Sequence, residues 1–390
     1  MRYYIIAGEA SGDLHAAHLM HAIRLQDHAA DFRFVGGDMM AAEGGTMARH
    51  YRTLAYMGFI PVMTHLRTIM RGMAEAKADI RAWQPDVLVL VDYPGFNLAV
   101  AKHIHRHTGT PIAYYIPPKI WAWKEHRLAT IRRCVDRTFT ILPFETPYYA
   151  ARGYDVEYVG NPTREEVESF IATYRETREA FAARHGLDPA RPIIAILAGS
   201  RRQEIGDNLA RMLRAAAHFP HCQAVVAGAP GLDRSAYAPH MAGTAARLIF
   251  GQTYALLSHA QAALVTSGTA TLETAILGVP QVVCYHLRAG RLMKLLKRLF
   301  IHVPHVSLVN LIGRRAIVPE LIADDANPRR IADELAAIID DTAPARHAML
   351  DGYADVMLSL GTAHAADGAA RGITALAREG RTRPASTTKA

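Results

Sequence analysis

The sequence predicts an α/β protein with two Rossmann-like domains that face each other across a cleft, followed by C-terminal helices. The chain has 390 residues, half of them hydrophobic, which is more than a single core usually organises. In both halves, short β-branched segments alternate with helical periodicity, which is typical of a parallel sheet covered on both faces. Each half opens with a strand, a small-residue turn and a helix, an arrangement that suits a nucleotide-type ligand.

In the first half, β-branched and aromatic runs predict strands, and apolar residues at helical spacing predict helices. The first strand, residues 2–7, ends at the turn GEASGD, and the third contains the apolar run VLVLV. The expected strands are 2–7, 32–36, 86–91, 112–116 and 138–142, and the expected helices are 14–25, 66–83, 97–108 and 124–133.

The character of the sequence changes near residue 163, where a charged helix over 164–185 leads to Gly186 and a new strand. Strands are then predicted at 193–197, 223–227, 247–249, 262–266 and 281–285, and helices at 203–218, 269–277 and 329–340. The predicted domains are 1–163 and 164–344, with one or two amphipathic helices over 345–378 and a disordered tail over 379–390.

Composition narrows the class of protein. No run of about 18 uncharged apolar residues occurs and the N-terminus has no leader pattern, so we expect a cytosolic protein. The three cysteines, Cys134, Cys222 and Cys284, form no CxxC pair and are expected to be buried apolar residues. The net charge of +8 predicts an anionic partner: nucleic acid, phospholipid or a phosphorylated substrate. The basic residues are scattered and match no nucleic-acid motif, so nucleic acid is disfavoured.

Candidate catalytic residues follow the strands of the first half. Asp92 comes directly after VLVLV, at a strand end where a carboxylate can accept a proton from an attacking hydroxyl. A helix cap is an equally good interpretation of Asp92. In the turn GEASGD, Gly8, Ser11 and Gly12 bring backbone amides towards a ligand, although an ordinary turn capped by Ser11 or Asp13 is the commoner case.

The segment 114–124 is rich in aromatic residues and prolines directly after a strand. Rigid aromatic loops of this kind line sugar or lipid sites, although a single tryptophan more often packs in the core. We therefore include Trp121 and Trp123, together with Asn97 from the turn after Asp92, in a predicted substrate loop.

Two turns in the second half are suited to phosphate. Residues 197–205, LAGSRRQEI, and residues 266–273, TSGTATLE, each run from a strand into a helix. In the second turn, Glu273 is placed to bind both hydroxyls of a ribose. The alternative is that the serine of the first turn is a plain helix cap. The predicted nucleotide ligands here are Gly199, Ser200, Arg201, Ser267, Gly268, Thr269 and Glu273.

Two stretches, 57–71 and 288–300, combine large apolar side chains with arginine and lysine, a pattern that favours an anionic membrane surface. Core-facing helices with solvated basic faces are the alternative. The residues expected to face the membrane are Met57, Phe59, Ile60, Val62, Met63, Leu66, Arg67, Met70, Arg71, Arg291, Lys294, Lys297 and Arg298. The histidine-rich stretch HIHRH at 103–107 has no acidic partner motif, so no metal site is predicted.

Taken together, these motifs resemble the lipid-A-disaccharide synthase family over nearly the whole chain. The matching segments are GEASGD at 8–13, MGF at 57–59, VDYPGFN at 91–97, IWAWK at 120–124, LPFE at 142–145, LAGSRRQEI at 197–205, SGTATLE at 267–273, HVSLVNLI at 305–312 and PELI at 319–322. Gly95, Pro117 and Asn161 depart from the commonest family pattern, whereas Asp92 is kept.

The resemblance implies a GT-B glycosyltransferase that needs neither a metal nor another cofactor. It would transfer the sugar of UDP-2,3-diacylglucosamine to 2,3-diacylglucosamine 1-phosphate with inversion, giving a β-1,6-linked disaccharide phosphate and UDP. Asp92 would be the general base, Glu9 and Asp13 would arrange the acceptor, and Asn310 and Glu320 would join the residues that hold UDP. It further implies a homodimer with exchanged C-terminal segments, bound peripherally to the cytoplasmic face of the inner membrane of a Gram-negative bacterium.

Two other functions are compatible with parts of the sequence. Another GT-B-like enzyme, such as an undecaprenyl-linked N-acetylglucosaminyltransferase or a UDP-N-acetylglucosamine 2-epimerase, would share mainly the UDP-binding half, so GEASGD and DYPGFN argue against it. A non-catalytic nucleotide-binding module at a membrane surface would bind UDP equally well, but it would not depend on Asp92.

Overall fold

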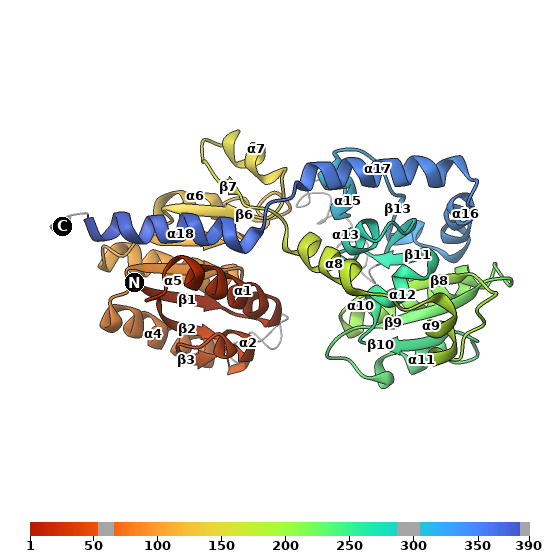
Figure 1. Ribbon diagram of the computed structural model, residues 1–390, viewed down its shortest axis with the longest axis horizontal. Coiled ribbons are helices and arrows are strands. Elements are labelled where there is room, and N and C mark those ends of the chain that lie inside the picture. Colours follow the sequence, from red (N-terminus) through yellow and green to blue (C-terminus); the bar gives the residue numbers. More distant parts are fainter. Residues whose placement is uncertain (54–65, 287–304, 383–390) are drawn as a thin grey trace. The chain divides into compact units, whose positions relative to one another are not determined.

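The computed structural model describes residues 1–53, 66–286 and 305–382, and its contacts divide the chain into two compact units (Figure 1). Unit 1 comprises Met1–Pro162 and Thr362–Ala390, and unit 2 comprises Thr163–Gly361. Each unit is a parallel sheet flanked by helices, so the prediction of two Rossmann-like domains with C-terminal helices is confirmed.

Unit 1 contains a seven-stranded parallel sheet in the order β3-β2-β1-β4-β5-β6-β7. Its strands are β1 (Arg2–Ala7), β2 (Asp31–Gly36), β3 (Thr46–His50), β4 (Val87–Val91), β5 (Ile112–Tyr115), β6 (Arg137–Thr140) and β7 (Glu157–Tyr158). Its helices are α1 (Ala10–Gln26), α2 (Asp38–Ala42), α4 (Leu66–Trp83), α5 (Pro94–His107), α6 (Arg127–Cys134), α7 (Glu145–Ala150) and α18 (Ala365–Thr382). The strand order reverses between β1 and β4, which is where open α/β sheets bind their ligands.

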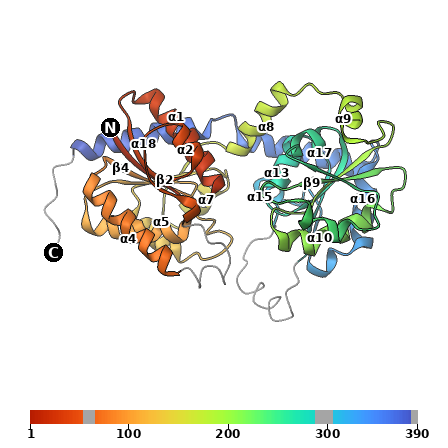
Figure 2. The same cartoon turned by 90° about the horizontal axis from the view of Figure 1, so that it is seen from below.

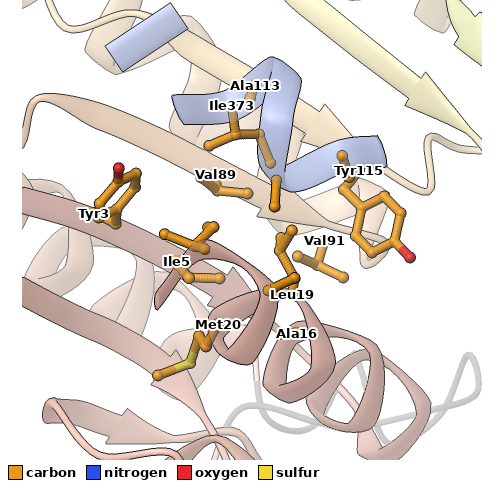
Figure 3. Close-up of a cluster of buried hydrophobic side chains, with 14 of the residues drawn as sticks. Tyr3, Ile5, Ala16, Leu19, Met20, Val89, Val91, Ala113, Tyr115 and Ile373 are labelled. Atoms are coloured by element: carbon orange, nitrogen blue, oxygen red, sulfur yellow. The ribbon is translucent and has the colours of Figure 1, made fainter. Parts of the chain in front are cut away.

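Both faces of this sheet are buried, which explains the continuous apolar runs of its strands. In β1, Tyr3 and Ile5 point to the face covered by α1 and α18, whereas Tyr4 and Ile6 point to the face covered by α4, α5 and α6. Figure 3 shows the first of these clusters, with Ile373 of α18 packed over the strands. The C-terminal helix is therefore an integral part of unit 1.

Small residues let α18 approach the sheet closely. A Cβ at Gly372 would clash with the ring of Phe139 on β6, so this position has room only for glycine. The helix continues to Thr382, and Glu379 pairs with Arg137 at 3.1 Å. The predicted disordered tail is thus wrong for residues 379–382, because this ion pair and the packing of the preceding turns hold the end of the helix.

Unit 2 contains a six-stranded parallel sheet in the order β10-β9-β8-β11-β12-β13. Its strands are β8 (Ile193–Leu197), β9 (Gln223–Gly228), β10 (Arg247–Phe250), β11 (Ala260–Thr266), β12 (Gln281–Tyr285) and β13 (Glu320–Ile322). Its helices are α8 (Pro162–Thr173), α9 (Arg178–His185), α10 (Arg202–Ala216), α11 (Ala238–Met241), α12 (Thr253–Ser258), α13 (Thr269–Ile276), α15 (Leu308–Gly313), α16 (Pro328–Ile339) and α17 (Pro344–Leu360).

The single helix predicted over 164–185 is two helices, α8 and α9. The chain leaves the helical conformation after Thr173 and restarts at Thr177, whose hydroxyl accepts from the backbone N–H of Ala180 at 3.3 Å. A threonine cap in the middle of a charged segment is the signal that the periodicity missed. The two C-terminal helices, α17 and α18, belong to different units.

Much of the predicted membrane surface lies outside the described residues: Met57, Phe59, Ile60, Val62, Met63, Arg291, Lys294, Lys297 and Arg298. Leu66 and Arg67 begin α4, and farther along this helix Met70 and Arg71 are exposed. None of the helices within 1–53, 66–286 and 305–382 has the length and hydropathy that a membrane span needs. The three cysteines are buried, as predicted.

Replacing Ile373 by alanine is expected to destabilise unit 1 by about 2–5 kcal/mol, because this fully buried side chain fills the space between α18 and the sheet. Urea unfolding followed by tryptophan fluorescence measures this, since all three tryptophans, Trp83, Trp121 and Trp123, lie in unit 1. The control Leu25→Ala removes a side chain of the same unit that is 62% exposed, and it should leave the midpoint unchanged. An equal midpoint for both variants would contradict this packing role of α18.

Candidate functional site

The ends of β1 and β4 form the first part of the site. These strands are neighbours with Ala7 opposite Val91, so the turns that follow them lie side by side at the carboxyl edge of the sheet. A Cβ at Gly8 would clash with the ring of Tyr93, so the aromatic ring can lie against the first turn only because residue 8 is glycine. The sequence placed Gly8 in this turn but gave no indication of its contact with Tyr93.

The turn after β4 has an unusual backbone. Asp92 and Tyr93 both adopt the left-handed conformation, with φ of 46° and 44°. Non-glycine residues persist there only where the surroundings fix them, and such strain gathers at functional sites. Here the carbonyl of Asp92 accepts hydrogen bonds from Asn97 Nδ2 at 2.7 Å and from the Tyr114 hydroxyl at 2.7 Å. The partly exposed Asp92 is thereby held at the strand end.

Asn97 has a positioning role in this structure. It is fully buried, and its amide also donates to the carbonyl of Val91 at 3.2 Å. The sequence predicted Asn97 among the substrate-contacting residues; in the structure its amide fixes the backbone on which Asp92 stands. Tyr114, which sequence reasoning did not single out, shares this task.

The remaining residues of GEASGD divide into two groups. Glu9 caps α1 through its backbone and lies close enough to Tyr93 to raise the pKa of that phenol, although burial raises it more. Asp13 is buried, and its carboxylate accepts from the backbone N–H groups of Gly37 at 2.6 Å and Met39 at 3.1 Å. Asp13 therefore holds the start of α2, and its predicted role in arranging the acceptor is not what this geometry supports.

Ser11 and Gly12 lie in the first turn of α1, where Ser11 is exposed and Gly12 is buried. A Cβ at Gly12 would meet Ala7 at an ordinary 3.5 Å, so this glycine is not required by close contact. Ser11 keeps the exposure that the predicted substrate contact needs.

The two tryptophans of the predicted substrate loop have different environments. Trp121 is 8% exposed, and its indole N–H donates to Glu145 Oε1 at 2.9 Å. Trp123 is 52% exposed and lies under the side chains of Lys124 and Arg127. Trp121 thus anchors the loop to the domain, and only Trp123 is available to a ligand.

Glu145, at the start of α7, is a buried carboxyl group that sequence reasoning missed. Besides Trp121, it receives the backbone N–H of Leu142 at 3.2 Å. Burial raises its pKa from 4.5 to about 7, against the opposing effect of the Trp121 hydrogen bond. The sequence signal for this site was the glutamate in LPFE at 142–145, an acidic residue just after a predicted strand.

In unit 2, the turn between β8 and α10 is closed by its own glutamate. Glu204 accepts from the backbone N–H of Ser200 at 2.9 Å and from Arg201 Nη1 at 2.8 Å. Gly199 has a φ of 116°, and a side chain there would run into Glu204. Of the three predicted phosphate ligands, Ser200 thus has its amide engaged, while the largely exposed Arg201 keeps donors for an anion.

The turn between β11 and α13 is more open. Gly268 and Thr269 are exposed, and no side chain caps the first turn of α13. Ser267 donates its hydroxyl to the carbonyl of Val306 at 2.8 Å, which ties this turn to the segment before α15. The exposed amides at the helix start are therefore the better phosphate site of the two.

A cavity of about 570 Å³ lies within unit 2, against the helix α13 that follows this turn. Glu273 of α13 and Glu166 of α8 line it, together with aromatic side chains and the backbone that follows β10. The Tyr254 hydroxyl donates to Glu273 Oε1 at 3.4 Å. Burial, and then the charge of Glu166, raise the pKa of Glu273 to about 7. A cavity of this size and lining suits a nucleoside.

Asn310 and Glu320 have structural roles. Asn310 is 1% exposed; its amide donates to Glu320 Oε1 at 2.9 Å and accepts from the backbone N–H of Val318 at 2.9 Å. Glu320 also accepts from the backbone N–H of Ser307 at 2.8 Å. These groups fasten the start of α15 to β13, so the predicted direct contacts with UDP are not supported by this geometry.

His103 and His107 stack with 4.2 Å between ring centroids, and His107 Nδ1 lies 2.7 Å from the carbonyl oxygen of His103. Within the described ranges, no group of three or more histidine, cysteine, aspartate or glutamate residues is arranged to hold a metal ion.

The environment of Glu145 predicts a pH effect on stability. The folded protein keeps the Glu145 proton up to about pH 7, whereas the unfolded chain loses it near 4.5, so this contribution to stability falls as the pH rises between these values. Glutamine cannot ionise. Glu145→Gln should therefore be more stable than the parent protein at pH 8 and similar at pH 5, as measured by urea unfolding.

The matched control is Asp155→Asn, an exposed carboxylate of the same unit. It should change neither midpoint. If the parent and Glu145→Gln lose stability equally between pH 5 and pH 8, Glu145 does not hold its proton in the folded state.

Comparisons with known proteins agree with this architecture. The pattern of the family described as lipid-A-disaccharide synthetase matches residues 3–362. The lipid-A-disaccharide synthase of Myxococcus xanthus is 39% identical over 389 residues, covering 97% of this chain and 98% of that protein. The enzyme of the same name from Syntrophus aciditrophicus is 39% identical over 342 residues, covering 86% of this chain and 87% of that protein.

Among solved structures, a UDP-GlcNAc 2-epimerase from Neisseria meningitidis bound to UDP-GlcNAc superposes with a TM-score of 0.65 at 11% identity, covering 97% of this chain and all of that one. At such low identity the likeness shows the shared fold alone. The family match over nearly the whole chain and the 39% identity decide the classification. The resemblance found in the motifs is confirmed, and the chain belongs to the lipid-A-disaccharide synthetase family.

Proposed function

We propose that the protein joins UDP-2,3-diacylglucosamine to 2,3-diacylglucosamine 1-phosphate, forming the β-1,6-linked lipid A disaccharide phosphate and UDP. The observation that carries this proposal is the 39% identity to lipid-A-disaccharide synthases over 97% of the chain. The epimerase alternative is supported only by likeness of fold, which many unrelated activities share.

Asp92 is the proposed general base. The acceptor 6-hydroxyl oxygen attacks the anomeric carbon of the donor, its proton passes to the Asp92 carboxylate, and the bond to the diphosphate breaks with its electron pair leaving on UDP. Attack opposite the leaving group inverts the anomeric carbon in one step. The fixed backbone of the Asp92 turn favours this role, because a base must hold its position towards the hydroxyl.

Unit 2 is the proposed UDP site. The cavity beside Glu273 takes the nucleoside, with the Glu273 carboxylate accepting both ribose hydroxyls, and the exposed amides at Gly268 and Thr269 take the diphosphate. Arg201 adds a cation that stabilises the charge on departing UDP. Glu9 and Ser11, beside the Asp92 turn, contact the acceptor in this proposal.

The lipid substrates account for the predicted membrane surface. We expect peripheral binding to the cytoplasmic face of the inner membrane through the apolar basic stretches, of which the exposed Met70 and Arg71 on α4 are within the described residues. A homodimer is proposed on the family resemblance alone. Cosedimentation with anionic vesicles and light scattering test these two expectations.

Asp92→Asn should reduce turnover by about 10²–10⁴-fold, because asparagine keeps the size of the side chain but cannot accept the proton. The assay is mass spectrometry of the tetraacyl disaccharide phosphate formed from both acylated substrates in detergent. UDP binding should be unchanged, and the exposed control Asp155→Asn should be fully active. Full activity of Asp92→Asn would exclude this base, and turnover of unacylated UDP-N-acetylglucosamine alone would favour the epimerase.

UDP binding should depend on the protonation of Glu273. Its raised pKa of about 7 means that the carboxylate forms only as the pH rises through this value, and the neutral acid accepts ribose hydroxyls less well. UDP affinity should therefore weaken as the pH falls below 7, by up to about tenfold per unit, in calorimetric titrations. Glu273→Gln should bind more weakly and lose this pH dependence, whereas an unchanged pH profile would remove Glu273 from the ribose site.

A further inference from the structure

Two cationic side chains contact the ring of the exposed tryptophan in unit 1. Lys124 Nζ lies 4.2 Å from the centroid of the Trp123 ring, and the guanidinium carbon of Arg127 lies 5.5 Å from it. The indole is 52% exposed, so this group, which we name the Trp123 cation cluster, faces outwards. Contact with the ring keeps both long side chains in one place.

Neither cation has a carboxylate partner within the described part of the chain. Neighbouring cations of unit 1 do have one: Arg152 pairs with Glu125, and Arg137 pairs with Glu379. Arg127 is only partly exposed, and a guanidinium that is partly desolvated without an anion retains all its hydrogen-bond donors for a ligand. The positive charges of the cluster are therefore not compensated by a carboxylate.

The loop that carries the cluster is held in place by hydrogen bonds to α7. Besides the bond between Trp121 and Glu145, the Tyr148 hydroxyl donates to the carbonyl of Ile120 at 3.4 Å. Lys124 itself adopts a left-handed backbone with a φ of 55°. A strained residue on an anchored loop indicates a preorganised site, because the fold maintains the conformation against its local preference.

The cluster also lies within electrostatic reach of the Asp92 turn. Burial is the main reason that the pKa of Tyr114 is raised; Asp92 raises it further, whereas Arg127 opposes both. The Tyr114 hydroxyl is the group that donates to the carbonyl of Asp92. The carboxylate of Asp92 and the guanidinium of Arg127 therefore act on one hydroxyl, at the same edge of unit 1.

We propose that Arg127 and Lys124, ordered by Trp123, bind the phosphate monoester of the acceptor substrate. This inference rests on the proposed function and adds to it the group that selects a phosphorylated acceptor. The planar fork of Arg127 takes two phosphate oxygens, and Lys124 supplies a second positive charge. Held by its phosphate, the acceptor sugar presents the hydroxyl at its other end to Asp92. The cluster thus sets both acceptor specificity and acceptor orientation.

The test compares the phosphorylated acceptor with unphosphorylated 2,3-diacylglucosamine at saturating donor. Arg127→Gln should raise KM for the phosphorylated acceptor by about tenfold to a hundredfold, the loss expected for a charged hydrogen-bonded pair. Lys124→Gln should act in the same direction but less. Turnover of the unphosphorylated acceptor should be unchanged, so the preference for phosphate is lost. Arg127→Lys should recover part of the effect, because it restores the charge without the fork.

Arg133→Gln is the matched control, since it removes the same charge from an exposed site on α6. Its KM should equal that of the parent protein, and the urea midpoint by tryptophan fluorescence reports correct folding of unit 1 in every variant. If the parent forms no disaccharide, the proposed function fails. If the parent is active but Arg127→Gln behaves like Arg133→Gln, the phosphate site is overturned. It is also overturned if Arg127→Gln loses only binding to phosphatidylglycerol vesicles, because the cluster would then serve the membrane.

Discussion

The contact between Gly8 and the Tyr93 ring is the constraint on which the site of unit 1 depends. The parallel register of β1 and β4 brings their two turns together, and residue 8 leaves no space for a side chain. The left-handed backbone of Asp92 is then held in place by hydrogen bonds from Asn97 and Tyr114 to its carbonyl oxygen. The hydrogen bonds that fix Asp92 are made by its backbone. Its carboxylate oxygens are not needed to hold it in position, so they are available for chemistry.

In unit 2, one turn is fixed by an internal side chain and the other is left open. Both of its turns place a helix start at the carboxyl edge of the sheet, but Glu204 occupies the amide of one, whereas the other stays open and begins the helix that carries Glu273. A helix start attracts whichever carboxylate or phosphate is nearest. An internal glutamate therefore rigidifies the first turn, and the second is left for a ligand.

Most of the fold could be predicted from the sequence, because the central strands are continuous apolar runs such as VLVLV in β4. The strands that were missed, β3, β7 and β13, lie at sheet edges and are short or mixed in polarity. Edge strands bury less side-chain surface, so tertiary pairing rather than local pattern makes them strands. The break between α8 and α9 was hidden for a related reason, since charged residues on both sides mask a single threonine cap.

The sequence by itself determined the two α/β units, the position of Asp92 at a strand end, the phosphate-compatible turns and the family. Tertiary structure alone decided which polar side chains remain free. Asp13, Asn97 and Asn310 have the residue types of a binding site, yet the structure commits their oxygens or amides to backbone groups. A sequence shows where a polar group stands along the chain. Only folding brings up the distant N–H or carbonyl that satisfies it, because an unpaired buried polar group destabilises the folded state.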